Sequence, residues 1–171
     1  HFGKRPAMRD SQGDTNWRDF GERITVAAGV LRGLGIKSGE RVAIYARNSI
    51  RFDELKWGAF HAGVVAVPVN WRLAPVEIAH ILEDSACELV FVEADFLPIF
   101  DVTELAPWRD KLVCLAGEGT ADIWDYEKLF ETAPGVGPAD VTPDDDALIL
   151  YTGGTTGRSK GVRLSHTNIL S

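Results

Sequence analysis

The stretch YTGGTTGRSKGV, residues 151–162, holds glycines, hydroxyl side chains and positive charge in the same short space. Glycine adopts positive φ readily and lets the backbone come close to a ligand, so several backbone N–H groups can point at one anion. Lys160 adds a full positive charge. The other residues that could contact such an anion are Thr152, Gly153, Gly154, Thr155, Thr156, Gly157 and Ser159. Amide, hydroxyl and ammonium donors together suit a polyphosphate, so we expect a phosphate-binding loop here.

The apolar run ALILY (147–151) before this loop is typical of a buried strand. A strand that ends in a glycine-rich loop leading toward a helix is a common geometry for binding phosphate beyond the carboxyl end of a sheet. Two known loops do not match. The Walker A loop needs lysine directly after its last glycine, whereas Lys160 comes three residues after Gly157, and the dinucleotide fingerprint needs a glycine at 152. A surface hairpin between ALILY and VRLS, rich in glycine for flexibility alone, is the structural alternative.

Charge is unevenly distributed along the chain, whose net charge is −7. Residues 1–85 hold twelve Lys/Arg and ten Asp/Glu, whereas residues 86–171 hold six and fifteen. No acidic residue follows Asp146, although Arg158, Lys160 and Arg163 all do. Nucleic-acid binding usually needs a broad basic face. A small basic cluster in an acidic surround therefore indicates a small anion and no nucleic acid partner.

The loop and three other segments resemble one enzyme superfamily. YTGGTTGRSKGV resembles the signature loop of the AMP-forming (adenylate-forming) acyl-CoA synthetase and ligase superfamily, Y-T-S-G-T-T-G-x-P-K-G-V, and ten positions agree when Arg158 is counted at the variable site. Gly153 replaces the usual serine and Ser159 the usual proline. The segments GERVAIYARNS, VPVNWRLAPVEIAHILEDS and LSHTN resemble the other N-terminal landmarks of that family, in the same order.

The resemblance implies a two-step reaction. A carboxylate attacks the α-phosphorus of ATP to give an acyl-adenylate and pyrophosphate, and a thiol, usually that of coenzyme A, then displaces AMP. It also implies Mg²⁺ as a cofactor and a carboxylic acid as substrate, without deciding among fatty, aromatic and short-chain acids. The phosphate contacts that it assigns are Thr152, Gly154, Thr155, Thr156, Gly157 and Lys160, with Gly153 and Ser159 as neighbours.

The same family pattern places the adenine-binding segment, the magnesium ligand, the acyl pocket and the catalytic lysine after Ser171. We therefore expect residues 1–171 to be a partial N-terminal domain that is inactive alone. A homodimer stays an open alternative. So do two other classes of function: a non-catalytic nucleotide- or phosphate-binding α/β module, and a structural domain whose glycine loop contacts nothing.

Composition limits the remaining possibilities. The chain has 171 residues, of which 45% are hydrophobic, and this is typical of a soluble globular domain. No apolar stretch approaches the eighteen residues that a membrane helix needs, and the first ten residues lack the apolar core of a signal peptide, so we expect a cytoplasmic protein with no integral membrane segment. Cys87 and Cys114 lie in separate apolar contexts and read as buried free thiols.

The histidines form no metal-binding pattern, and we predict no metal site among these residues. His61 and His80 lie within helical patterns, where a structural role is favoured. For His166 and Asn168 two interpretations stay open: they line the phosphate cavity, or they cap a helix or pack in the core.

Apolar runs and amphipathic segments alternate along the chain, which predicts an α/β fold: a doubly wound, mostly parallel sheet with helices on both faces. We expect a hairpin over 5–17 and a helix that begins after Thr15 or Asn16 and ends near Gly35. The other helices are expected at 52–60, from Pro75 and at 122–133, with a surface loop at 134–146. The expected strands are 41–46, 64–69, 88–92, 111–116 and 147–151.

Overall fold

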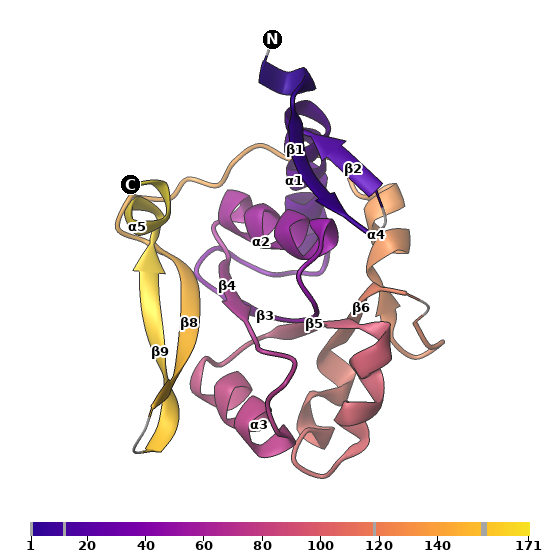
Figure 1. Cartoon of the computed structure of the whole chain (residues 1–171), viewed down its shortest axis with the longest axis vertical. Helices are drawn as coiled ribbons and strands as arrows, with labels where there is room; N and C mark the ends of the chain where they lie inside the picture. Colours follow the sequence, from indigo (N-terminus) through magenta and orange to yellow (C-terminus); the bar gives the residue numbers. More distant parts are fainter. Residues whose placement is uncertain (1, 12, 118, 155–156) are drawn as a thin grey trace.

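A seven-stranded sheet in the order β7-β6-β5-β3-β4-β8-β9 lies at the centre of the computed structural model, which describes residues 2–11, 13–117, 119–154 and 157–171 (Figure 1). Neighbouring strands run parallel except for β8 and β9, which are antiparallel. The strands are β3 (Arg41–Tyr45), β4 (Val65–Pro68), β5 (Leu89–Glu93), β6 (Leu112–Ala116), β7 (Trp124–Asp125), β8 (Asp146–Gly154) and β9 (Gly157–Ser165). The predicted mostly parallel sheet is confirmed.

Helices cover both faces of this sheet, as expected (Figure 1). Successive strand residues alternate between two cores: Val42 and Ile44 of β3 pack into one, and Ala43 and Tyr45 into the other. The first core is closed by α1 (Trp17–Gly33), α2 (Ile50–Ala62) and α4 (Tyr126–Thr132). The second is closed by α3 (Pro75–Asp84) and the 3₁₀ segments η2 (Ala94–Asp101) and η3 (Ala106–Lys111).

The N-terminal segment forms the predicted hairpin, with β1 (Pro6–Asp10) antiparallel to β2 (Gly13–Asn16) in a separate two-stranded sheet after the 3₁₀ turn η1 (Phe2–Lys4). Asn16 then starts α1, because its side-chain oxygen accepts hydrogen bonds from the amides of Arg18 and Asp19, both at 3.0 Å. At the other end, Gly35 has φ +82° and so turns the chain away from the helix.

The predicted helix at 122–133 is shorter in the structure, because Asp125 caps it. The Asp125 carboxylate accepts from the amides of Glu127 at 3.0 Å and Lys128 at 3.4 Å, so α4 begins at Tyr126, and the two residues before it form β7. The predicted loop at 134–146 forms neither helix nor strand over 134–142, but its last residue, Asp146, already belongs to β8. The backbone of this loop is tied to α1 and α2. These ties are Val136 N to Thr25 O at 3.1 Å, Ala139 N to His61 O at 2.8 Å, and His61 Nε2 with Val136 O at 2.9 Å.

A buried ionic cluster joins the three helices on the first face. The Glu54 side chain is fully buried, and its carboxylate accepts hydrogen bonds from Arg23, from Arg51 at 2.9 Å and from the Tyr126 hydroxyl at 3.0 Å. Burial, followed by the nearby Glu54 charge, raises the pKa of Tyr126 well above its usual value, so the phenol stays protonated and continues to donate. Arg51 also pairs with Glu127, at the surface of α4.

We expect Glu54→Ala to lower the free energy of unfolding by roughly 3 kcal/mol, the lower end of the range for a broken buried ion pair. Stability falls because Arg23 and Arg51 would lose the carboxylate that they share. The loss is at the lower end of the range because both arginines are partly exposed, so water can solvate their charges. Denaturant unfolding of the protein that contains this chain measures the loss. Glu127→Gln is the matched control and should cost less than about 1 kcal/mol, because this carboxylate is 41% exposed. Equal losses in the two variants would contradict the role given to the buried cluster.

The contact between α1 and α2 depends on a glycine. A Cβ added to Gly58 would lie 2.5 Å from the Ala27 Cβ, so the helices could not keep their separation. We expect Gly58→Ala to destabilise the protein by about 1–3 kcal/mol, as overpacking of a core does. Gly21→Ala, also within a helix but with nothing within 4 Å of the added Cβ, should be neutral or stabilising. Thermal unfolding of both variants tests the difference, which would be absent if the helices could part freely.

Candidate functional site

The glycine-rich segment lies at the turn of the β8–β9 hairpin. Thr152 pairs with Lys160 across the two strands, and Gly154 pairs with Gly157. The segment is therefore followed by a strand and not directly by a helix, since α5 (His166–Leu170) begins only after β9. The expected strand–loop–helix geometry is wrong in this respect, and the backbone follows the hairpin alternative.

The turn nevertheless lies on the expected side of the sheet. β8 is parallel to β4, in register at Ala66 and Leu148, so its carboxyl end lies at the same edge as the carboxyl ends of the other parallel strands. Figure 1 shows the hairpin extending past this edge, beside α3. Ligands of open α/β sheets bind at such edges. The placement is thus compatible with phosphate binding, although no helix among the described residues begins at the turn.

The described part of the hairpin brings the predicted donors of its two strands together. Thr152 and Gly153 are exposed on β8, and Lys160 is exposed opposite Thr152 on β9. A Cβ added to Gly153 would meet nothing within 4 Å, so the space beside this residue is open. Ser159 is half-buried. The predicted contacts Thr155 and Thr156 lie outside the described residues.

The basic cluster of the sequence separates into two parts in the structure. Arg163 Nε donates to Asp146 Oδ2 at 2.7 Å, near the end of β9 away from the turn, so its charge is neutralised there. Arg158 and Lys160 are exposed near the turn, and no ion pair is found for either within the described ranges. The positive charge offered to an anion at the turn thus comes from these two side chains.

Helix α3 supports both strands of the hairpin, which sequence reasoning missed. The Tyr151 hydroxyl donates to Asp84 Oδ2 at 2.6 Å, and His80 Nε2 lies 3.1 Å from the carbonyl oxygen of Ser159. Burial raises the pKa of Tyr151, and its hydrogen bond to Asp84 raises it further. The available signal was the pair His80 and Asp84, two polar residues four apart and so on one face of a helix.

Gly161 makes room for the Tyr151 ring. The two residues are cross-strand partners, and a Cβ at Gly161 would lie 3.1 Å from Tyr151 Cζ and 2.9 Å from Ile149 Cγ2. The ring can therefore lie across β9, and its hydroxyl reaches α3. The glycine at this position of the motif is explained by packing within the hairpin.

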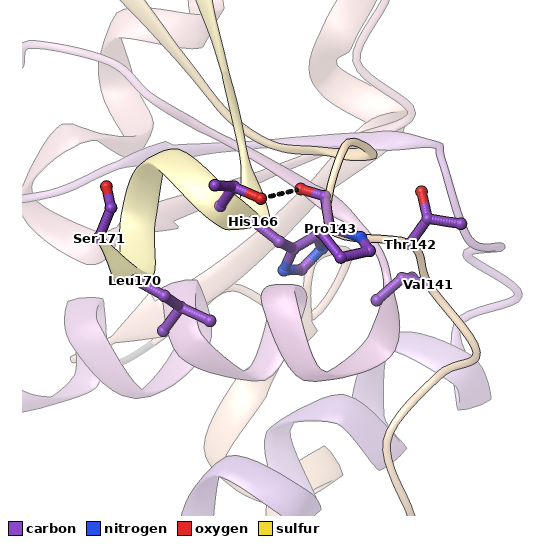
Figure 2. A pocket seen from close by; sticks show the side chains of 7 residues that line it. Val141, Thr142, Pro143, His166, Leu170 and Ser171 are labelled. Carbon is purple, nitrogen blue, oxygen red and sulfur yellow. Dashed lines mark hydrogen bonds between the residues drawn. The ribbon is translucent and has the colours of Figure 1, made fainter.

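His166 and Asn168 lie at the far end of β9, about 30 Å along the strand from the turn. Ser165 is the N-cap of α5, and Asn168 completes its capping box by accepting from the Ser165 amide at 3.0 Å. His166 lines a separate open cavity of about 470 Å³, formed with residues 141–143 and the end of α5 (Figure 2). Thr167 Oγ1 holds that loop by donating to Pro143 O at 3.0 Å. Neither residue lies near the hairpin turn, which favours the capping and packing interpretation.

Both cysteines are free and buried, as predicted. Burial raises the pKa of Cys87 to about 11, so its thiolate is scarce at neutral pH.

Within the described residues, no group of three His, Cys, Asp or Glu side chains could hold a metal ion. Over the same residues, no helix is long and apolar enough to span a membrane.

Comparison with known proteins gives a consistent family. The model of the family described as "AMP-binding enzyme" matches residues 1–171. The chain is 41% identical over 144 residues to the fatty acid–[acyl-carrier-protein] ligase ScoC of Streptomyces coeruleorubidus, covering 84% of this chain and 27% of that protein. It is 37% identical over 149 residues to the long-chain-fatty-acid–CoA ligase FadD13 of Mycobacterium tuberculosis, covering 84% and 28%.

The fold also matches a solved structure, that of the anthranilate CoA ligase AuaEII in complex with anthranoyl-AMP. The TM-score is 0.90 at 23% identity, over 96% of this chain and 32% of that one. The chain thus spans about a quarter to a third of the length of these relatives. Because the family model matches it from the first residue to the last, the chain belongs to the AMP-binding enzyme family.

Proposed function

We propose that the protein containing this chain is an AMP-forming acid–thiol ligase. Its carboxylic acid substrate attacks the α-phosphorus of ATP, giving an acyl-adenylate and pyrophosphate, and the thiol of coenzyme A then displaces AMP to form a thioester. The observation that carries the proposal is the pairing of Thr152 with Lys160, beside the open space at Gly153, near the carboxyl edge of the sheet. Family membership supports the reaction class.

The hairpin turn is proposed to hold the β- and γ-phosphates of ATP. Lys160 would supply a compact positive charge and Thr152 a hydroxyl donor, and these two lie across from each other on neighbouring strands. The open space beside Gly153 lets a phosphate come close to the backbone. The complete set of proposed contacts, which includes two residues assigned by motif position alone, is Thr152, Gly153, Gly154, Thr155, Thr156, Gly157, Ser159 and Lys160.

These groups would act by electrostatic stabilisation. Negative charge builds up on the leaving pyrophosphate as the bond to the α-phosphorus breaks, and donors already held in place stabilise that charge without reorganising. Strand pairing between β8 and β9 fixes the backbone that carries them. Mg²⁺ would share the same phosphate charge, and we propose that its ligands lie outside these 171 residues.

The acid and the thiol are proposed by analogy with the relatives. Their names include ligases for long-chain fatty acids and for hydroxybenzoates, so we propose a fatty or aromatic acid as substrate. ScoC is named as a fatty acid–[acyl-carrier-protein] ligase, so an acyl carrier protein is a second possible acceptor. Acceptor assays should therefore include both thiols.

Lys160→Ala should lower kcat/KM for ATP by about 100-fold in the full-length protein, because one preorganised donor to a developing charge is worth roughly 3 kcal/mol. AMP release with a panel of fatty, aromatic and short-chain acids measures the effect. Arg158→Ala is the control: it removes an exposed charge at the variable position of the motif and should change the value only a few-fold. An unchanged Lys160→Ala enzyme would remove the phosphate role from this residue. ATP binding without AMP release for any acid would favour the non-catalytic nucleotide-binding module.

Gly153→Ser should lower KM for ATP by about two- to fivefold. The substitution adds a hydroxyl beside the proposed phosphates, and its Cβ meets nothing within 4 Å, so the gain of one hydrogen bond comes without a clash. Gly153→Ala is the matched control, because it adds the Cβ without the donor. Equal KM values for the serine and alanine variants would show that no phosphate lies within reach of position 153.

A further inference from the structure

We propose that His80 is a positioning residue for the phosphate-binding hairpin: it holds the peptide between Ser159 and Lys160, and Asp84 on the same helix holds the opposite strand. This inference rests on the proposed function. The two contacts are His80 Nε2 with Ser159 O at 3.1 Å and the Tyr151 hydroxyl with Asp84 Oδ2 at 2.6 Å. They flank the Thr152–Lys160 pair, one on each strand.

Helix α3 is a firm support for these contacts. Its buried residues Ile78, Ile81 and Leu82 are at most 1% exposed and pack in the second core of the sheet. His80 and Asp84 are one helical turn apart, so both can face the hairpin while the rest of the helix stays anchored. Because α3 is anchored in the core, its side chains can hold the hairpin at a fixed position relative to the core.

The held peptide is the one that enters Lys160. The carbonyl of Ser159 and the amide N–H of Lys160 belong to one planar group, so fixing the direction of the carbonyl also fixes the direction of the N–H. A carbonyl oxygen only accepts, so His80 Nε2 must carry the proton in this contact. The hydrogen bond from His80 therefore fixes the orientation of the peptide from which the backbone and side chain of Lys160 continue.

Support from α3 adds to the strand pairing of the hairpin where glycines are concentrated. Gly153, Gly154, Gly157 and Gly161 lie in or beside the turn, and glycine has more conformational freedom to lose than any other residue. Within the described residues, β9 is the edge strand of the sheet. The sheet therefore holds the hairpin only through the pairing of β8 with β4. The His80 ring also packs edge-on against the Tyr151 ring, with centroids 6.4 Å apart, which links the two contacts.

The test compares His80→Leu with His80→Gln in the full-length protein. Leucine removes the donor, whereas the glutamine amide nitrogen can donate from nearly the same place. We expect His80→Leu to raise KM for ATP about five- to tenfold in ATP–pyrophosphate exchange, with KM for the acid unchanged, and His80→Gln to stay within about twofold. Amide hydrogen exchange over residues 157–165 should be faster in the leucine variant only.

His61→Leu is the matched control. His61 Nε2 makes the same kind of contact, with the Val136 carbonyl at 2.9 Å, away from the hairpin. Its loss should lower the melting temperature without changing the ratio of the two KM values. If His80→Leu behaves like His61→Leu, or if His80→Gln fails to rescue it, the positioning role is overturned.

Two further results separate this inference from the function on which it rests. A Lys160→Ala effect on ATP without any His80→Leu effect would overturn the inference and leave the proposed function standing. Absence of ATP–pyrophosphate exchange in the unaltered protein, with every acid tried, would overturn the proposed function, and the role of His80 in it would fall too.

Discussion

The β8–β9 hairpin joins the parallel sheet along a short stretch, and the arrangement of the candidate site depends on this constraint. β8 is in register with β4 at Ala66 and Leu148, whereas the residues proposed to bind phosphate begin at Thr152 and extend past the sheet edge. The outer half of the hairpin is therefore held by its own strand pairing and by α3. A site built this way can place backbone donors close to a ligand, but it depends on contacts that the sheet does not supply.

The parallel sheet could be predicted because its strands are buried on both faces. Such strands consist almost wholly of apolar residues, as RVAIY and LVCLA do here, and amphipathic helices alternate with them along the chain. β9 has no such signal, since most of its residues are exposed. It is a strand because β8 pairs with it, and a pairing partner is a tertiary feature that local pattern does not contain. For this reason the sequence did not predict that β9 separates the glycines from helix α5.

The candidate site also contains residues that could be predicted from the sequence and residues that could not. Thr152 and Lys160 could be proposed from residue type and motif spacing, and the structure brings them together as cross-strand partners. The residues that support them lie far away in sequence: His80 and Ser159 are 79 positions apart, and Asp84 and Tyr151 are 67. Sequence alone could show that His80 and Asp84 share a helix face, but not which strand that face would meet.

One departure from the family signature, Ser159 in place of proline, also acquires a physical meaning. Where the signature has proline, this chain has Ser159, so the restraint on φ that a proline ring imposes is missing at this position. A proline at a compatible site contributes about 0.4–1 kcal/mol by limiting the backbone. A hydrogen bond to a carbonyl contributes about 0.5–1.5 kcal/mol. The hydrogen bond from His80 to the Ser159 carbonyl thus contributes a free energy similar to that of the missing proline restraint. A tertiary contact replaces a local restraint, and residue 159 of the motif is linked directly to the packing of α3.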